Sequence, residues 1–317
     1  ARHVHDIEFQ DVASPKSRQT PKLLELAGSP FEPKLLDRNR LSVLEGGWQL
    51  SGAHGDIKEG IWLDENRVQH RVAIKSPKYS ELDKHREAIA RELRVLATVP
   101  GHPNIVTVVG FCLTDGPLIV EEFMATNLEA VLCGADQGLT YDEIIRISLD
   151  VARGLDHLHE HGVTHYDIKP SNILMDGEFN AKLADFSCSE LKLASSMSLA
   201  VRGSAGYIAP EIVEKGLCSR RGGPGRHFPT DKVDVYSFGK VMLECVTGSL
   251  NPENAAAERI CHGPLWELIR ACVSGCPKER PGCKRIVERL EGMVKDEGGW
   301  EPGWKARRPM QEISQAS

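Results

Sequence analysis

The chain has 317 residues, enough for one two-lobed domain or for two domains. Hydrophobic residues make up 41% and charged residues 26%, as in ordinary globular proteins, and the formal net charge of -6 argues against a general nucleic-acid binder. No apolar run approaches the roughly 20 residues that cross a bilayer, and residues 1–20 lack the apolar segment of a secretory signal. Nine cysteines in a chain of this length do not indicate a disulfide framework, so we expect reduced thiols in an intracellular setting.

Residues 1–43 are predicted to be an extended N-terminal segment. Prolines and scattered charges occur there without a sustained hydrophobic period. A strand-like pattern begins at about Leu44 and leads into LSGAHGDI at 50–57. Gly52 and Gly55 in this stretch let the backbone approach a phosphate group closely, because glycine has no Cβ. Such turns are also common in ordinary hairpins, so this stretch decides nothing by itself.

The strand predicted at 71–75 carries a lysine on an otherwise small-residue face. The sequence RVAIK alternates, which places two aliphatic residues on one face and Ala73 and Lys75 on the other. A lysine there could be a solvated edge residue. The helix predicted next offers an alternative, because Glu92 lies in its apolar stripe and an unpaired buried carboxylate is costly. We therefore expect Glu92 to pair with Lys75, with Glu87 as the second candidate.

Two further elements precede the most informative motif. An apolar strand ends at the acidic residue Glu121. A helix is predicted at 140–161, because Thr140 and Glu143 can form a capping box and Gly162 provides a C-terminal stop.

The most informative stretch reads HYDIKPSN, and the chain reads DFS shortly after it. Asp167 can orient and deprotonate a hydroxyl group, and Lys169 can neutralise charge on a moving phosphoryl group. Asn172 and Asp185 can hold Mg²⁺ through their oxygen atoms. Together these residues predict phosphoryl transfer.

The two motifs closely resemble those of the protein kinase superfamily, whose usual forms are H-R-D-x-K-x-x-N and D-F-G. The stretches RVAIK, GHPNIV, GSAGYIAPE, DVYSFG and KERPG match in the same order, most nearly as in tyrosine-kinase-like and receptor-like Ser/Thr kinases. The resemblance covers about residues 44–292 and implies a bilobal α+β fold with nucleotide bound at the hinge. It assigns a small antiparallel β lobe with one helix to 44–121, the hinge to 122–124, a larger helical lobe to 125–292 and a tail to 293–317.

The resemblance also implies an ATP site. Ala73 would lie against adenine, Lys75 would contact the α and β phosphates, and Glu92 would hold that lysine in place. The hinge backbone would bind the base. The remaining members of the site are residues of the glycine-rich loop, the hinge and the pocket floor: Leu50, Gly52, Gly55, Ile57, Glu122, Phe123, Met124 and Leu174.

The resemblance implies that five residues C-terminal to the D-F-S motif bind substrate or stabilise the fold. The stretch GSAGYIAPE ends the activation segment, and Ser204 and Tyr207 in it would face the protein substrate. Glu211 in the same stretch would pair with Arg280. Asp234, in a helix that is apolar nearly all round and therefore buried, would anchor the catalytic loop.

The implied function is an ATP- and Mg²⁺-dependent Ser/Thr protein kinase that transfers the γ-phosphoryl group to hydroxyls of a protein substrate. We expect a cytoplasmic chain, either separate or as the intracellular part of a larger protein. A pseudokinase, acting as a nucleotide-binding or scaffolding module, is the alternative. Three departures favour it: Leu50 at the first loop glycine position, Ser187 in place of the D-F-G glycine, and Glu121 at the back of the nucleotide pocket. A small-molecule kinase is disfavoured by the full substrate-loop motif.

Glu121 is open to two interpretations. Buried behind the nucleotide, its carboxylate would need a cation and would compete with Glu92 for Lys75. A shift of the strand by one residue would instead put Glu121 in solvent.

Two other departures bear on regulation. Tyr166 replaces the arginine that would pair with a phosphorylated activation segment, so we expect activity without that phosphorylation, although Ser189 and further serines lie in the segment. Residues 216–229 form an insertion that contains Arg220, Arg221 and Arg226. It is either a solvated loop or a docking surface for an acidic partner.

Overall fold

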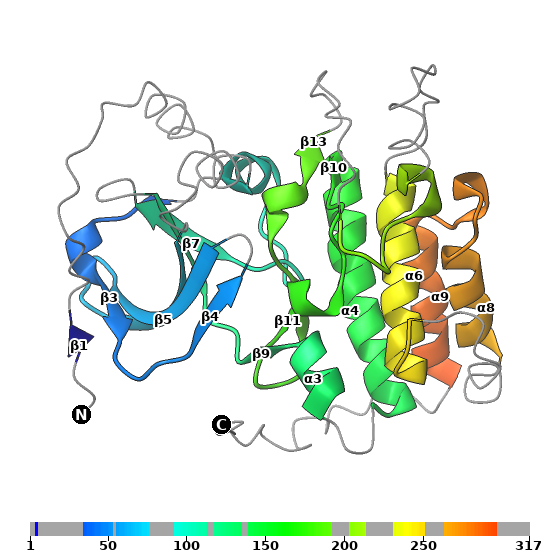
Figure 1. The fold of residues 1–317 in the computed structure, drawn as a ribbon, viewed down its shortest axis with the longest axis horizontal. Helices are drawn as coiled ribbons and strands as arrows, with labels where there is room; N and C mark the ends of the chain where they lie inside the picture. The colour runs from blue at the N-terminus through cyan, green and yellow to red at the C-terminus, as the bar shows by residue number, and fades with distance from the viewer. Residues whose placement is uncertain are drawn as a thin grey trace. The chain divides into compact units, whose positions relative to one another are not determined.

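The structure is a computed structural model, and it describes residues 4–5, 34–52, 55–76, 92–112, 117–134, 139–191, 203–213, 231–250 and 263–296. Contacts divide the chain into two units, one formed by Ala1–Gly101 with Val106–Phe123 and the other by His102–Ile105 with Met124–Ser317. The first unit is built mainly from strands and the second mainly from helices (Figure 1). The predicted two-lobed α+β organisation is therefore confirmed.

The first unit contains an eight-stranded sheet in its described part. The neighbour order is β1-β3-β5-β6-β8-β7-β2, with β4 beside β5, and the pairs are antiparallel except for the parallel pair of β2 and β7. A helix is described over 92–98, and the 3-10 helix η1 (Arg38–Arg40) joins β2 to β3. The strands are β1 (Val4–His5), β2 (Lys34–Leu35), β3 (Leu41–Leu44), β4 (Gln49–Gly52), β5 (Gly55–Leu63), β6 (Gln69–Ser76), β7 (Val108–Cys112) and β8 (Leu118–Glu122).

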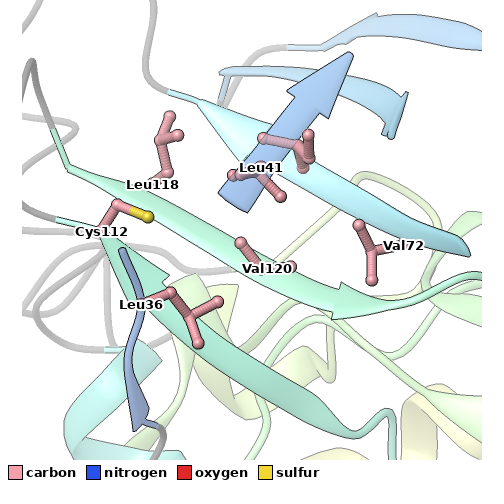
Figure 2. Close-up of a cluster of buried hydrophobic side chains, with 7 residues drawn as sticks. Leu36, Leu41, Val72, Cys112, Leu118 and Val120 are labelled. Atoms are coloured by element: carbon pink, nitrogen blue, oxygen red, sulfur yellow. The ribbon is translucent and has the colours of Figure 1, made fainter. Parts of the chain in front are cut away.

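This sheet has one apolar face and one face with charged residues. Successive side chains of a strand point to opposite faces. On one face, aliphatic residues of β6 and β8 form a buried core with residues from the neighbouring strands (Figure 2). Ala73 and Lys75 lie on the other face, together with Glu121, because Ala73 pairs with Glu121 and Lys75 with Ile119 in the ladder. The core residues are Leu36, Leu41, Val72, Ile74, Cys112, Leu118 and Val120.

The sheet begins earlier than the predicted boundary at residue 44. Strand β3 starts at Leu41, and both Leu36 and Leu41 are buried in the core. The elements in this region are two to four residues long. Such short elements contain too few residues to show a hydrophobic periodicity, so the pattern alone does not reveal them.

Five helices of the second unit have bounds in the described residues: α3 (Leu128–Gly134), α4 (Tyr141–Glu160), α6 (Asp231–Thr247), α8 (Pro264–Cys272) and α9 (Cys283–Asp296). Figure 1 shows α4, α6 and α9 side by side. Helix α4 begins as predicted, with a capping box between Thr140 and Glu143, and it is followed by Gly162 at a φ of 71°. Helix α9 continues to Asp296, past the predicted domain end at 292.

Short elements around the helices carry the catalytic motifs. Strand β11 (Ile173–Met175) lies between β12 (Ala181–Leu183) and β9 (Thr126–Asn127), and β10 (Val163–Thr164) pairs with β13 (Glu190–Leu191). The 3-10 helices are η3 (Pro170–Asn172), η4 (Phe186–Cys188) and η5 (Pro277–Glu279). In the part of the chain that the structure describes, no helix combines the length and apolar character needed to cross a membrane.

Candidate active site

Lys75 and Glu92 form a buried ion pair in the first unit. The Lys75 Nζ atom lies 2.8 Å from Glu92 Oε1 and 2.9 Å from Oε2. The side chain of Lys75 is 9% exposed and that of Glu92 is 1% exposed. Two buried charges of opposite sign satisfy each other here, whereas either one alone would carry a large desolvation cost. The structure therefore places Glu92 where the sequence predicted it, while Glu87 lies outside the described residues.

Glu121 is buried on the same face of the sheet as this pair. Its residue is 5% exposed, and it lies directly opposite Ala73 in the β6–β8 ladder. Because Lys75 is two residues from Ala73, Glu121 occupies a diagonal cross-strand position relative to Lys75. The alternative placement of Glu121 in solvent is therefore wrong.

The glycine-rich stretch forms the hairpin of β4 and β5. Leu50 pairs with Ile57 and Gly52 with Gly55, and Gly55 has a φ of 142°. A glycine suits that backbone conformation, which side chains with a Cβ rarely adopt. Ile57 pairs in turn with Lys75, so the hairpin and the lysine share one sheet face. Residues 53–54, at the tip, lie outside the described residues.

The predicted hinge lies at the end of β8. The Glu122 amide donates to the Thr107 carbonyl at 2.9 Å, and the Thr107 amide donates to Glu122 Oε1 at 2.7 Å, so both groups of Glu122 are used within the first unit. The Arg71 guanidinium lies 3.8 Å from the centroid of the Phe123 ring. Met124 begins the second unit.

The catalytic loop in the second unit brings a carboxylate, an ammonium group and a hydroxyl together. Ser204 Oγ donates to Asp167 Oδ1 at 2.9 Å, and Lys169 Nζ donates to Ser204 Oγ at 2.8 Å. Lys169 Nζ also lies 2.9 Å from Asp167 Oδ2. The Asp167 side chain is 4% exposed and that of Lys169 is 20% exposed. Contacts at both of its oxygens hold the Asp167 carboxylate in one orientation.

Asn172 and Asp185 fit a magnesium site in their chemistry. Asn172 Nδ2 donates to the Asp167 carbonyl at 2.8 Å and to Asp167 Oδ2 at 3.0 Å, which makes the amide oxygen the atom that Asn172 can offer to a cation. The Ala184 amide donates to the Asn172 carbonyl at 3.0 Å, and this bond brings the following residue, Asp185, near Asn172. Amide and carboxylate oxygens are ligands that Mg²⁺ prefers, usually with phosphates supplying further ones.

The described residues contain no group of three or more His, Cys, Asp and Glu side chains that could hold a metal ion. A metal site at Asn172 and Asp185 would therefore be an open one, completed by a ligand. Leu174, the predicted pocket floor, lies between them in sequence, half-buried on β11 between the fully buried Ile173 and Met175.

Asp234 anchors the backbone just before Asp167. Its Oδ2 atom accepts from the His165 amide and its Oδ1 atom from the Tyr166 amide, both at 2.8 Å. The carboxylate is fully buried. Tyr166 has a φ of 67° and Asp185 a φ of 64°, conformations that cost non-glycine residues on the order of 1–3 kcal/mol and often occur at functional sites. Two of the four described non-glycine residues with a positive φ are therefore motif positions, and the other two are Arg67 and Phe179.

The substrate-loop residues contact the helices of the second unit. Glu211 accepts from both terminal nitrogens of Arg280, at 2.7 and 2.8 Å, which is the predicted pairing. The Tyr207 hydroxyl donates to Glu244 Oε2 at 2.5 Å. Burial and the Glu244 carboxylate raise the pKa of Tyr207, so its hydroxyl stays protonated.

Ser189 of the activation segment is not accessible to phosphorylation in this structure. It is fully buried, and its hydroxyl donates to the His165 carbonyl at 3.3 Å. Ser189 directly precedes β13 (Glu190–Leu191), which pairs with β10 just before the catalytic loop, and this position explains the burial. The other serines of the segment at 195–198 and the insertion at 216–229 lie outside the described residues.

Several contributing residues were not predicted from the sequence. His159 Nε2 lies 2.9 Å from Asp234 Oδ2, and Cys283 Sγ lies 3.3 Å from His159 Nδ1. Glu59 is buried and contacts Arg71 Nε at 2.6 Å. No local pattern indicates these contacts, except that a carboxylate in the strand pattern of β5 could have marked Glu59 as a paired residue.

Comparison with known proteins agrees with this geometry. A family model described as protein kinase domain matches residues 51–290. Serine/threonine-protein kinase PBL35 of Arabidopsis thaliana is 37% identical over 234 residues, which are 71% of this chain and 44% of that protein. Serine/threonine/tyrosine-protein kinase HT1 of the same plant is 32% identical over 76% of this chain and 64% of its own length.

Wall-associated receptor kinase-like 21, also from Arabidopsis thaliana, is 30% identical over 84% of this chain and 44% of its own length. The chain thus spans about half the length of the relatives it matches. With the family model covering most of the chain and both catalytic motifs placed in one unit, the chain belongs to the protein kinase family.

Proposed function

We propose that the chain is a Ser/Thr protein kinase, which transfers the γ-phosphoryl group of ATP to the hydroxyl group of a protein substrate. The observation that carries this proposal is the contact between Ser204 and Asp167. An aliphatic hydroxyl donates to Asp167 Oδ1 at 2.9 Å while Asn172 and Lys169 hold the other carboxylate oxygen. A substrate serine or threonine presents the same group, so Asp167 is suited to orient it and accept its proton.

Lys169 supplies the positive charge beside the reacting hydroxyl. Its Nζ atom lies within 2.9 Å of both Ser204 Oγ and Asp167 Oδ2, so it is held beside the position that the acceptor oxygen would occupy. A fixed cation there stabilises negative charge that develops on the phosphoryl group. Asn172 and Asp185 would hold Mg²⁺, which when bound neutralises phosphate charge.

Lys75 is the candidate phosphate contact of the first unit. The two oxygens of Glu92 orient its ammonium group, and both residues are buried. Oriented in this way, the lysine can position a phosphate instead of sampling many rotamers. The relatives named as serine/threonine-protein kinases support protein hydroxyls as the acceptor class. The receptor kinases among the relatives favour an intracellular part of a larger protein as the setting of this chain.

We further propose that activity does not require phosphorylation of the activation segment. Tyr166 carries no positive charge, and its amide is already held by Asp234, so the catalytic loop is anchored without a phosphate. Phosphatase-treated and untreated protein should then transfer phosphate at equal rates. A fall of about tenfold or more after treatment, on the order of 1.4 kcal/mol in the barrier, would overturn this expectation.

A pseudokinase remains the second candidate, and the burial of Glu121 favours it. A second carboxylate on the face of Lys75 adds negative charge where ATP phosphates are expected to bind. In that case the chain would bind partners or nucleotide without transferring phosphate.

Phosphotransfer by the purified chain distinguishes the two candidates. The assay uses radiolabelled ATP, Mg²⁺ and a generic protein substrate, and Asp167→Asn is the matched variant. We expect wild-type transfer and a loss of roughly 10²–10⁴-fold in the variant, the range that a positioned general base contributes. ATP affinity, measured by calorimetry, should be unchanged in Asp167→Asn. ATP binding without any transfer by the wild type would establish the pseudokinase instead.

A further inference from the structure

In the second unit, two buried contacts link three side chains from three different helices. We call this series, from Cys283 through His159 to Asp234, the chain of contacts. Cys283, the first residue of α9, contacts His159 of α4 through Sγ and Nδ1 at 3.3 Å. The opposite ring nitrogen, Nε2, lies 2.9 Å from Oδ2 of Asp234 in α6. Cys283 is 3% exposed, the His159 side chain is 10% exposed and Asp234 is fully buried. Water is therefore largely excluded from both contacts.

Cys283 and Asp234 together favour a proton on Nε2 of His159, the nitrogen that faces Asp234. The group bound at one ring nitrogen sets the protonation of the other. A thiol donates to Nδ1 of a neutral ring, and a thiolate accepts from Nδ1 of a protonated ring. In both cases Nε2 carries its proton and donates to the Asp234 carboxylate. Burial alone would lower the pKa of His159, but Cys283 and Asp234 outweigh burial and raise it to about 10.

The same carboxylate holds the catalytic loop. Asp234 Oδ2 accepts from His159 and also from the His165 amide at 2.8 Å, while Oδ1 accepts from the Tyr166 amide at 2.8 Å. A change in the His159 bond therefore acts on the oxygen that the loop backbone uses. Tyr166 is strained at a φ of 67° and immediately precedes Asp167, so the geometry of Asp167 depends on this anchor.

We propose that Cys283 is a positioning residue for phosphoryl transfer, which acts through His159 and Asp234 on the backbone of the catalytic loop. The proposal rests on the proposed function for its kinetic consequence, but its structural part does not. A thiol that is 124 residues from its histidine partner in sequence would thereby influence a carboxylate that it does not touch.

The test compares Cys283→Ala with Cys283→Ser and with Cys272→Ala. Serine keeps a donor and acceptor at the same place. Cys272 is a buried thiol of α8 that packs against Gly239 of α6 and lies close enough to Cys283 to interact with it electrostatically, so its alanine variant controls for loss of packing beside the chain of contacts while all three members stay in place. All variants are measured at a temperature at which circular dichroism shows them folded.

The first readout is independent of activity. Two-bond proton–nitrogen spectra of ¹⁵N-histidine-labelled protein report which nitrogen of His159 carries the proton, and hydrogen exchange reports the protection of the Tyr166 amide. We expect Cys283→Ala to shift the His159 nitrogen signals and to speed exchange at Tyr166, while Cys283→Ser and Cys272→Ala resemble the wild type. Unchanged His159 signals and Tyr166 exchange in folded Cys283→Ala would overturn the proposal, even if the wild type proves inactive.

The second readout is kinetic. In an active wild type, Cys283→Ala should lower kcat by about fivefold, on the order of 1 kcal/mol in the barrier, with an unchanged KM for ATP. Serine should restore most of that rate. An equal fall in Cys272→Ala would show that packing, and not the chain of contacts, is responsible.

Discussion

The two units each contain a buried ion pair, and the pairs are built differently. In the first unit, Lys75 meets Glu92 through one ammonium nitrogen, at 2.8 and 2.9 Å. In the second unit, Arg280 meets Glu211 through two nitrogens, at 2.7 and 2.8 Å. Arg280 also donates to the carbonyls of Ser274 and Lys232. The arginine is thus fixed by a planar fork with several acceptors, whereas the lysine is a point charge on a flexible stem.

This difference indicates different purposes for the two pairs. A bidentate arginine with further backbone contacts has one low-energy arrangement, which suits a structural tie between the activation segment and the helices. A lysine near two carboxylates, Glu92 and Glu121, can exchange partners at lower cost.

Removing the Arg280 side chain should be the most destabilising change. Arg280→Met leaves the buried Glu211 carboxylate without its cation, and breaking such a pair costs roughly 3–5 kcal/mol. Denaturant unfolding should show this loss as a lower midpoint. The double variant Arg280→Met with Glu211→Leu is the control, because it removes both charges and should recover much of the stability. A single variant as stable as the wild type would show that the tie is not structural.

The Lys75 pair should affect activity more than stability. Lys75→Met should reduce the affinity for ATP and phosphotransfer by at least about tenfold, because a positioned phosphate contact is lost. Its effect on unfolding should be smaller than that of Arg280→Met, because Arg280→Met also removes the donor to the carbonyls of Ser274 and Lys232. Calorimetry with ATP and denaturant unfolding measure the two effects. Equal destabilisation by both variants would remove the contrast between the pairs.

Exchange of partners at Lys75 is tested by Glu121→Thr. Threonine removes the second carboxylate while keeping a branched side chain suited to a strand. ATP affinity or phosphotransfer should rise by about threefold, on the order of 0.7 kcal/mol. The reason is that Lys75 then interacts only with Glu92 and the phosphate, without a competing carboxylate. The isosteric control Glu121→Gln removes only the charge and should act in the same direction. A fall in ATP affinity for both variants would mean that Glu121 supports nucleotide binding.

The stacked histidines of the second unit should have a smaller effect, which concerns the pH dependence of stability. The His102 and His157 rings lie 4.7 Å apart. Burial, together with the charges of His157 and Arg153, lowers the pKa of His102 below 6.5. The unfolded chain therefore binds a proton at His102 more readily than the folded chain. Stability should fall as the pH drops below about 6.5 through the lowered pKa of the folded state.

The measurement is the free energy of unfolding at pH 7.0 and 5.5. The variant His102→Asn keeps an acceptor for the Asn104 amide, which donates to His102 Nδ1 at 3.1 Å. It should show a weaker pH dependence than the wild type. An identical slope in both proteins would exclude His102 as a source of the acid sensitivity.

The parts of this protein that depend on short-range patterns could be predicted from its sequence. The capping box of Thr140 and Glu143 and the alternation around Lys75 are local, and both elements form where they were predicted. The two catalytic motifs likewise indicated roles for Asp167, Asn172 and Asp185 from residue type and order alone. The family followed from the same motifs.

Several contacts between side chains that are distant in sequence could not be predicted, because they depend on how strands and helices pack. The burial of Glu121 depends on the exact register of β8 against β6, and a shift of one residue would move it to the other face. The early start of the sheet depends on strands too short to show a period. Cys283 and His159 are 124 positions apart, and they meet because α9 packs against α4. The sequence pattern around Cys283 indicates only a buried helix residue. Helix packing brings such pairs together through the shapes of whole side-chain surfaces, which no local pattern encodes.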